Sequence, residues 1–186
     1  MPILGIISAA ISGNLFAPSG AYDSIATVTV STAVASVTFS SIPATYTHLQ
    51  VRGISRNVSS GIDQLYIKTI NGGGSTYADH YLYGQGSSVT SSGAFNGVQM
   101  SVAAVSGSTQ TAGIFGAFVI DILDYANTNK YKTFRSLGGV DANGSGYVWY
   151  PSGLWQSTAA ITSFTLAPSV NIDQYSSFAL YGIKGA

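Results

Sequence analysis

The segment GIFGAFVIDIL, residues 113–123, places apolar side chains on both faces of an extended chain. In a β-strand successive side chains alternate, so Ala117 and Val119 point one way. Phe118 and Ile120 then point the other way. A strand that is apolar on both faces is usually covered on both. We therefore expect this segment at the centre of a sandwich, or between a sheet and a partner subunit.

Shorter segments with a period of two recur along the chain and are bounded by Gly, Asn, Ser or Pro. Leu49 and Val51, for example, share one face, while Gln50 and Arg52 take the other, as in a strand with one face on a core. About eight to ten such strands, spaced about ten residues apart, predict an all-β, antiparallel sandwich of jelly-roll-like type. We expect one domain over residues 21–186, preceded by an extended apolar N-terminal arm over residues 1–20.

Two connections carry specific expectations. The sequence NGGG, residues 71–74, has glycines that can adopt positive φ, which predicts the corner of a hairpin. Residues 88–113 are rich in small side chains and carry no charge. Within them the alternation of Val98, Met100 and Val102 predicts one strand, and the remainder is expected to form long surface loops.

The composition narrows the class of protein. Hydrophobic residues make up 46% of the 186 residues and charged residues 8%, and all seven acids are Asp. The absence of Glu and the abundance of Thr, Val and Tyr favour strands over exposed helices. A formal net charge of zero argues against partners held by phosphate contacts, namely nucleic acid and anionic membranes. A neutral, apolar surface also favours association with other protein subunits.

The densest group of charges lies in VIDILDYANTNKYK, residues 119–132. A metal site would need several converging oxygens, yet Asp121 and Asp124 are three apart and point to opposite faces of a strand. The turn-forming sequence ANTN favours a hairpin end with ion pairs instead. The sequence DANGSG, residues 141–146, predicts a glycine-rich turn, since it lacks the later acid of a calcium loop.

No motif in the sequence dictates a reaction. His80 adjoins Asp79, but neighbours on a strand point apart, and no serine lies in a GxSxG elbow. Phosphate-binding glycine motifs and cysteine ligands are absent from the sequence. His48 is expected to point outward, packing on Tyr46 or bonding to a loop. We therefore expect a protein that is not an enzyme and that needs no cofactor or metal.

Aromatic residues are concentrated in GYVWYPSGLW, residues 146–155, and in YADHYLYG, residues 77–84. Aromatic rings beside Asn, Asp and Gln can stack on sugars, and the same rings are favoured in cores and protein interfaces. Both interpretations stay open at this point. The candidates for a glycan-binding or partner-binding surface are Tyr81, Tyr83, Tyr147, Trp149, Tyr150 and Trp155.

Four stretches carry a resemblance to a known group of proteins. They are SIPATYTHLQVRGISR (41–56), VIDILDYANTNKYKTFRSLGG (119–139), SFALYGIKGA (177–186) and the opening MPILGIISAAISGN (1–14). In these stretches the chain resembles small structural proteins of tailed bacteriophages. The resemblance implies a component of the virion, assembled in the cytoplasm of the bacterial host. Capsid decoration, or cement, is the role we expect first, and the alternative is a tail-fibre or tail-tip component with a carbohydrate-binding or receptor-binding surface.

The resemblance also implies partners. We expect a homo-oligomer, most simply a trimer, that contacts other virion proteins such as the major capsid protein or tail proteins, and in the tail alternative a host surface glycan. The apolar run from Ile3 to Ile11 is too short to span a bilayer, which needs about 20 apolar residues. It is instead a candidate for docking on a neighbouring subunit. The expected assembly contacts are Ile3, Leu4, Ile6, Ile7, Ile11, Leu15 and Phe16.

Overall fold

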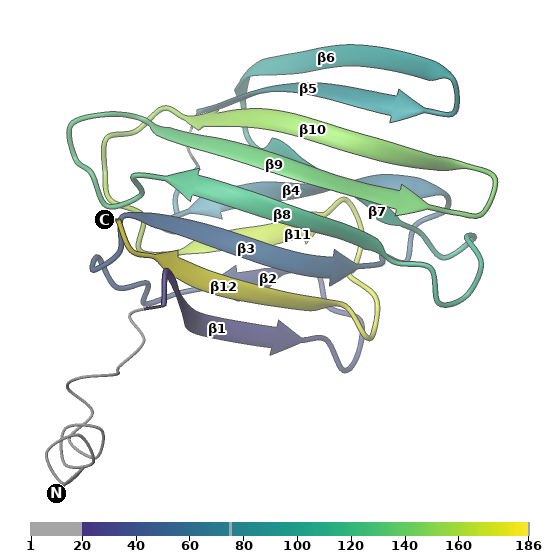
Figure 1. Ribbon diagram of the computed structural model, residues 1–186, viewed down its shortest axis with the longest axis horizontal. Helices are drawn as coiled ribbons and strands as arrows, with labels where there is room; N and C mark the ends of the chain where they lie inside the picture. The colour runs from purple at the N-terminus through teal and green to yellow at the C-terminus, as the bar shows by residue number, and fades with distance from the viewer. Residues whose placement is uncertain (1–19, 75, 186) are drawn as a thin grey trace, which may run out of the picture.

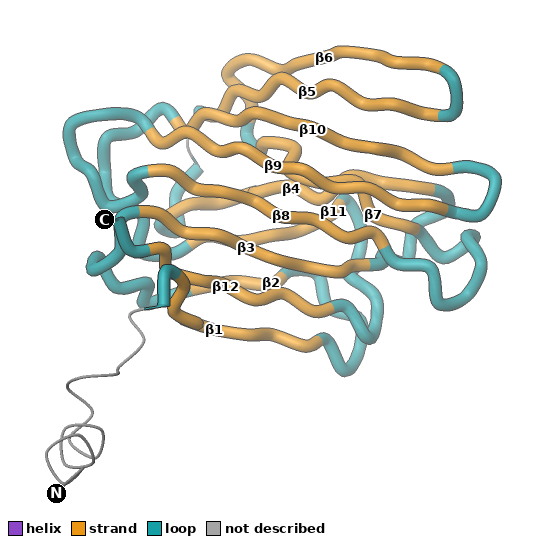
Figure 2. The backbone as a smooth tube through the Cα atoms, in the orientation of Figure 1, coloured by secondary structure: helices purple, strands orange, loops and turns teal. Residues whose placement is uncertain are grey.

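The computed structural model describes residues 20–74 and 76–185, and within them it is an all-β sandwich of antiparallel strands (Figures 1 and 2). Twelve strands are present in these residues, more than the eight to ten predicted. Among these residues, no helix of the length and apolarity needed to cross a membrane is found. The strands are β1 Tyr22–Thr29, β2 Val37–Phe39, β3 His48–Ser55, β4 Ile62–Ile70, β5 Tyr77–Gln85, β6 Ser88–Gly97, β7 Met100–Ser106, β8 Gly116–Leu123, β9 Lys132–Asp141, β10 Gly146–Trp155, β11 Phe164–Pro168 and β12 Ser177–Ile183.

The strands form a large sheet of eight and a small sheet of four. The large sheet has the order β1-β12-β3-β8-β9-β10-β5-β6, and the small sheet has the order β2-β11-β4-β7. Eight strands are divided equally between the sheets: β1, β3, β8 and β12 lie in the large sheet, and β2, β4, β7 and β11 in the small one. We call these eight strands the core set. The remaining four, β9, β10, β5 and β6, lie together at one end of the large sheet and are called the extension (upper part of Figure 1).

The core lies between the two sheets and follows the predicted alternation. Leu49 and Val51 of β3 are fully buried, as are Leu65 and Ile67 of β4. Gly53 of β3 lies directly opposite Phe118 of β8 in the large sheet, and a Cβ on Gly53 would lie 2.3 Å from the Phe118 ring. Glycine at position 53 therefore makes room for an aromatic side chain, and the sequence alone does not predict this contact.

Strand β8 contains the segment that is apolar on both faces, which was expected either at the centre of a sandwich or between a sheet and a partner subunit. Phe118 and Ile120 point into the core and are 4% and 0% exposed. Ala117 and Val119 point away from the small sheet, and Val119 is 36% exposed in the single chain. The strand is thus not buried on both sides within one molecule. Its second apolar face is open on the outside of the large sheet.

Two local predictions are corrected. The NGGG turn does place Asn71 and Gly72 at positive φ, but it does not close a hairpin. It carries the chain from β4 in the small sheet to β5 in the large sheet. Residues 88–113 contain two strands, β6 and β7, where one was predicted. Met100 and Val102 lie in the buried β7, whereas Val98 is 80% exposed between the strands.

The extension is only partly covered by the small sheet. Strand β7, at the edge of the small sheet, packs against β8, β9 and β10. Strand β6 is the outermost strand of the large sheet and is exposed along nearly its whole length (Figure 1). The hairpin of β5 and β6 therefore projects past the edge of the small sheet. Strand β5 still contacts the small sheet, through β7.

Candidate functional site

The outer face of the large sheet carries exposed apolar side chains on six neighbouring strands. Folded monomers seldom leave a contiguous surface of this kind open to water. We call this set the outer band. It consists of Ile54 of β3, Val119 of β8, Leu137 of β9, Val148 and Tyr150 of β10, Leu82 of β5, and Val89 and Phe95 of β6.

The pairing of the strands brings these side chains side by side. Val119 lies opposite Leu137 across β8 and β9, and Tyr150 lies opposite Leu82 across β10 and β5. Leu137 is 56% exposed and Val148 is 62% exposed, so neither packs on the core. A shallow hollow next to Val119 is lined by Leu137 and Tyr150, which shows that the central members share one surface.

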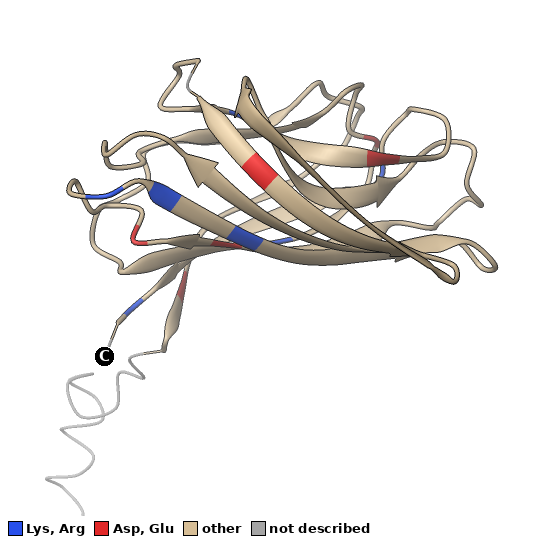
Figure 3. Cartoon of the chain, turned by 90° about the horizontal axis from the view of Figure 1, so that it is seen from above, with Lys and Arg blue, Asp and Glu red and all other residues tan. Residues whose placement is uncertain are grey.

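The charges beside the outer band are paired with each other. The Arg135 guanidinium lies 2.9 Å from the Asp121 carboxylate, and the Gln50 amide donates to the same carboxylate at 2.7 Å. Arg52 donates to Gln50 and lies over the rings of Tyr22 and Tyr181. Figure 3 shows that charged residues are few and scattered over the described part of the chain. The outer band is therefore apolar, and the charged residues beside it carry no excess of positive or negative charge.

A second candidate site lies on the other face of the extension, where four aromatic rings form a continuous stack. Trp149 of β10 stacks on Tyr81 at 4.6 Å and on Tyr83 at 5.0 Å between ring centroids. Tyr147 follows at 5.7 Å from Tyr83. The stack forms because Trp149 and Tyr83 are paired across antiparallel strands, and residues two apart share a face.

This stack borders a cleft of about 170 Å³, here called the aromatic cleft. The opposite wall comes from Asp63 and Gln64 of β4 and from Ala104 of β7. The Asp63 carboxylate is held in place, since it accepts from the Asn57 amide at 3.0 Å and from the backbone N–H of Gln64 at 2.7 Å. The cleft is thus lined by aromatic rings on one side and by Asp63, Gln64 and Ala104 on the other.

Hydroxyl and indole groups near the cleft are neutral donors. Burial raises the pKa of Tyr66 on β4, and the nearby Asp63 carboxylate raises it further, so this phenol stays protonated. The indole Nε1 of Trp149 is buried and has no hydrogen-bond partner in the described chain. Buried donors are normally satisfied, so an unpaired one beside a cleft is notable.

The six aromatic candidates from the sequence do not form one site. Tyr81, Tyr83, Tyr147 and Trp149 meet in the aromatic cleft. Tyr150 belongs to the outer band on the opposite face, because it follows Trp149 directly in the strand. Trp155 is 3% exposed and lies in the hydrophobic core at the far end of β10.

The candidate assembly contacts in the N-terminal arm lie outside the described residues. Ile3, Leu4, Ile6, Ile7, Ile11, Leu15 and Phe16 all precede residue 20, where the description begins.

The charged hairpin at residues 119–132 has the structural role that its sequence predicts. Asp124 forms an ion pair with Lys130, and its backbone N–H donates to His48 Nδ1 at 2.9 Å, so His48 does bond to a loop. In the described residues no group of three or more His, Asp, Glu or Cys side chains could hold a metal ion. Asp141 and Gly144 lie in the predicted glycine-rich turn, where Gly144 has a φ of 112°.

Lys132 differs from the ion-paired charges of this hairpin. Its side chain is fully buried, and burial lowers its pKa. The ammonium donates to the backbone carbonyls of Asn127 at 2.5 Å, Lys130 at 2.9 Å and Thr158 at 3.1 Å. Lys132 therefore fixes two loops at the end of the extension.

Asp79 and His80 point to opposite faces of β5, as predicted. Asp79 is 5% exposed and accepts backbone N–H groups from Ser101 and Ala94. His80 is exposed on the outer face and contacts the edge of the Phe95 ring at 5.1 Å. The two side chains are not placed to act on one substrate.

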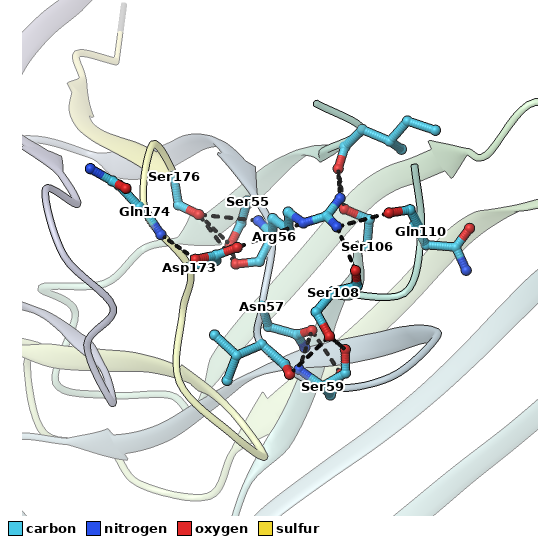
Figure 4. A network of polar contacts seen from close by, with 12 residues as sticks. Ser55, Arg56, Asn57, Ser59, Ser106, Ser108, Gln110, Asp173, Gln174 and Ser176 are labelled. Carbon is cyan, nitrogen blue, oxygen red and sulfur yellow. Dashed lines mark hydrogen bonds and ion pairs between the residues drawn. The ribbon is translucent and has the colours of Figure 1, made fainter. Parts of the chain in front are cut away.

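The most extensive polar network surrounds Arg56, just after β3 (Figure 4). The guanidinium donates to four backbone carbonyls of the loop between β7 and β8, at 2.9 to 3.1 Å. Its Nε lies 3.6 Å from the Asp173 carboxylate, and its backbone N–H donates to Ser176. Arg56 is 7% exposed, so it acts as a buried clamp that joins loops from distant parts of the chain.

Sequence reasoning missed the outer band, the Arg56 clamp and the contribution of Asp63 and Gln64 to the cleft. The outer band left a signal, because large apolar residues occur on both faces of residues 116–123 and 146–155. Arg56 left none, because the loop carbonyls that it binds are 52 to 58 residues away. Asp63 left none, because the aromatic residues of the cleft come from strands of the other sheet.

We compared the chain with protein-family models, with curated proteins and with solved structures, and none of them matches it.

Proposed function

We propose that this protein is a structural subunit of a tailed-bacteriophage particle, in the first place a capsid decoration protein, that associates with copies of itself through the outer band. The observation that carries the proposal is the outer band itself: six neighbouring strands expose apolar side chains on one face. The resemblance of four sequence stretches to phage structural proteins supplies the setting. A homotrimer in contact with the capsid lattice is the simplest assembly of this kind.

The strand order supports a jelly-roll interpretation of the core set. Its strands change sheet at each step along the chain except from β4 to β7, which share the small sheet, and the first and last strands, β1 and β12, are paired. Jelly rolls are common in viral capsid proteins and in lectins. Because the same fold serves several functions, the function has to be inferred from the surface of the molecule.

A second copy of this chain fits the outer band better than a charged partner does. The six strands, about 4.8 Å apart and about eight residues long at about 3.3 Å per residue, offer a face on the order of 750 Å². A stable interface buries about 800 Å² on each partner. Because Asp121 and Arg135 already pair with each other, two copies of this face would not repel.

Sedimentation velocity of the purified protein tests this association. Val119→Lys places a charge in the outer band, and the expected result is a shift from oligomer to monomer. Val170→Lys is the matched control, because Val170 is 37% exposed, close to the 36% of Val119, but lies outside the outer band. A wild-type protein that is monomeric at high concentration, or two variants with the same sedimentation, would contradict the proposal.

The virion setting needs its own test. A density map of the intact particle identifies the lattice that this chain touches, and its local symmetry gives the subunit number. Deletion of residues 1–18 is expected to abolish incorporation into particles if the apolar arm docks on a neighbour. Full occupancy without these residues would exclude that mode of docking.

The alternative function, recognition of a host glycan by a tail component, is favoured by a different observation. The aromatic cleft combines stacked rings with a polar wall that includes Asp63 and Gln64, and such a combination suits sugar binding.

A further inference from the structure

The aromatic cleft has a wall of rings that is still partly open. Tyr81, Tyr83 and Tyr147 are half-buried, whereas Trp149 beneath them is 3% exposed. Trp149 is stacked on both Tyr81 and Tyr83, which fixes the orientation of these two rings. The tyrosines thus offer rigid apolar faces and neutral hydroxyls at the same place, at a small entropic cost of ordering.

The opposite wall is polar and lacks positive charge. Asp63 and Gln64 line the cleft, and none of the described residues that line it is Lys, Arg or His. The Asp63 carboxylate is oriented by Asn57 and by the N–H of Gln64, and each of its oxygens retains further acceptor capacity. Such a wall accepts hydrogen bonds from hydroxyl groups and repels anions.

Size limits the occupant. The cleft encloses about 170 Å³, which is less than the roughly 300–1,000 Å³ of sites that enclose drug-sized ligands. It has room for one ring. The uncovered hairpin of β5 and β6 leaves the cleft accessible beyond the edge of the small sheet, so the ring can belong to a longer chain.

We infer that the aromatic cleft binds a neutral pyranose unit of a polysaccharide. The apolar face of the sugar ring stacks on Tyr83 and Tyr147, and its hydroxyls donate to Asp63 and exchange hydrogen bonds with Gln64. The absence of a cation among the lining residues and the presence of Asp63 select against acidic sugars and against phosphate-bearing ligands. This site is on the opposite face from the outer band and does not depend on association through it.

Trp149 provides the signal for a direct test. The chain has two tryptophans, so Trp155→Phe leaves Trp149 as the sole indole. This variant, checked for a native circular dichroism spectrum, is titrated with methyl glucoside, methyl galactoside, methyl mannoside and N-acetylglucosamine, and with sialic acid and adenosine. The expected result is a saturable fluorescence change with at least one neutral sugar, with a dissociation constant of about 1–10 mM for a single ring.

Variants in the same background locate the site. Tyr83→Ala is expected to weaken binding by at least about tenfold, in line with the loss of one stacking contact. Tyr83→Phe keeps the ring and should weaken binding only a few-fold, which guards against a folding defect. Tyr150→Ala is the matched control, since Tyr150 lies on the neighbouring strand β10 but on the outer face, and this variant should bind as tightly as its parent. Asp63→Asn should reduce the preference for neutral sugars over sialic acid.

Several results would overturn the inference. One is the lack of a saturable response to every neutral sugar in a folded Trp155→Phe protein. Another is an equal loss of binding in the Tyr83→Ala and Tyr150→Ala variants. Tighter binding of adenosine or of sialic acid than of any neutral sugar would assign the cleft to a different ligand class. None of these results bears on the sedimentation test, so the two proposals fail separately.

Discussion

The two halves of the large sheet use apolar residues in opposite ways. In the core half, Phe178 and Leu180 of β12 are fully buried against the small sheet. In the extension, Phe95 is 71% exposed and Leu137 is 56% exposed on strands of the same sheet. The comparison indicates that burial between the sheets stabilises the core half, whereas the extension, only partly covered by the small sheet, also keeps apolar side chains such as Phe95 and Leu137 available for contact.

The largest expected effect tests this difference with one residue type. Phe178→Ala should reduce the free energy of unfolding by about 3–5 kcal/mol, because it leaves a cavity between the sheets. Phe95→Ala should change the stability of the monomer by less than about 0.5 kcal/mol. Chemical denaturation at low protein concentration measures both. Similar losses in the two variants would show that the extension is packed as firmly as the core.

The buried cations offer a second comparison, beginning with Arg56 in the core half. Arg56→Met removes the donor to four loop carbonyls and should cost about 3 kcal/mol, since hydrogen bonds to charged groups are the stronger ones. The control is Arg52→Met, because Arg52 is exposed and stacks on tyrosines, and it should cost less than about 1 kcal/mol. Hydrogen exchange should also rise selectively in residues 107–115. Unchanged exchange there would refute the clamp.

Lys132 is the corresponding buried cation of the extension. Lys132→Met should cost about 2 kcal/mol, because three carbonyls lose their donor while the desolvation of the ammonium is relieved. Lys184→Met is the matched control, since Lys184 is exposed and pairs with Asp23, and its loss should be close to zero. Thermal unfolding of both variants measures the difference, and a larger loss for Lys184→Met would contradict this assignment.

The smallest expected effect concerns the turn that joins the two halves. Lys130, hydrogen-bonded to the carboxylate, holds the pKa of Asp124 below its ordinary value of 3.8. A lowered folded-state pKa adds stability above pH 3.8, and this contribution is lost as the pH falls through the folded pKa.

Asp124→Asn keeps a residue that tolerates the positive φ of 49° and removes the charge. At pH 7 it should be less stable than wild type by under about 1 kcal/mol, because the pair is partly exposed. The difference should shrink as the pH falls below 3.8. Urea denaturation at pH 7 and pH 3 provides the measurement, and a difference that grows at pH 3 would be inconsistent with the ion pair.

Much of the secondary structure was predictable, because alternation is a local property of the sequence. Leu49 and Val51, Phe118 and Ile120 are buried on the faces that the pattern assigned to them. The turn at residues 141–146 and the paired charges around Asp124 were also predictable from neighbouring residues. The prediction of a hairpin at Asn71 failed, because a glycine-rich turn is compatible both with a hairpin within one sheet and with a crossover from one sheet to the other.

The candidate sites were only half predictable. The aromatic clusters in the sequence pointed to Tyr81, Tyr83, Tyr147 and Trp149, and strand alternation separates Trp149 from Tyr150. Asp63 joins the cleft because β4 and β5 lie in different sheets that meet there. Such a juxtaposition depends on how the layers are stacked, and no local pattern contains it.

The sequence by itself determined that the described chain is built of antiparallel strands, and it determined which side chains share a face, because both follow from the two-residue period of an extended backbone. Only the tertiary structure decided which of two apolar faces is covered. The small sheet has four strands and the large sheet has eight, so part of the large sheet has nothing packed on it. In the described chain the small sheet covers only one face of β8 and β9. This layering, set by long-range strand pairing, leaves Val119 and Leu137 at the surface of the outer face while Phe118 and Phe134 lie in the core.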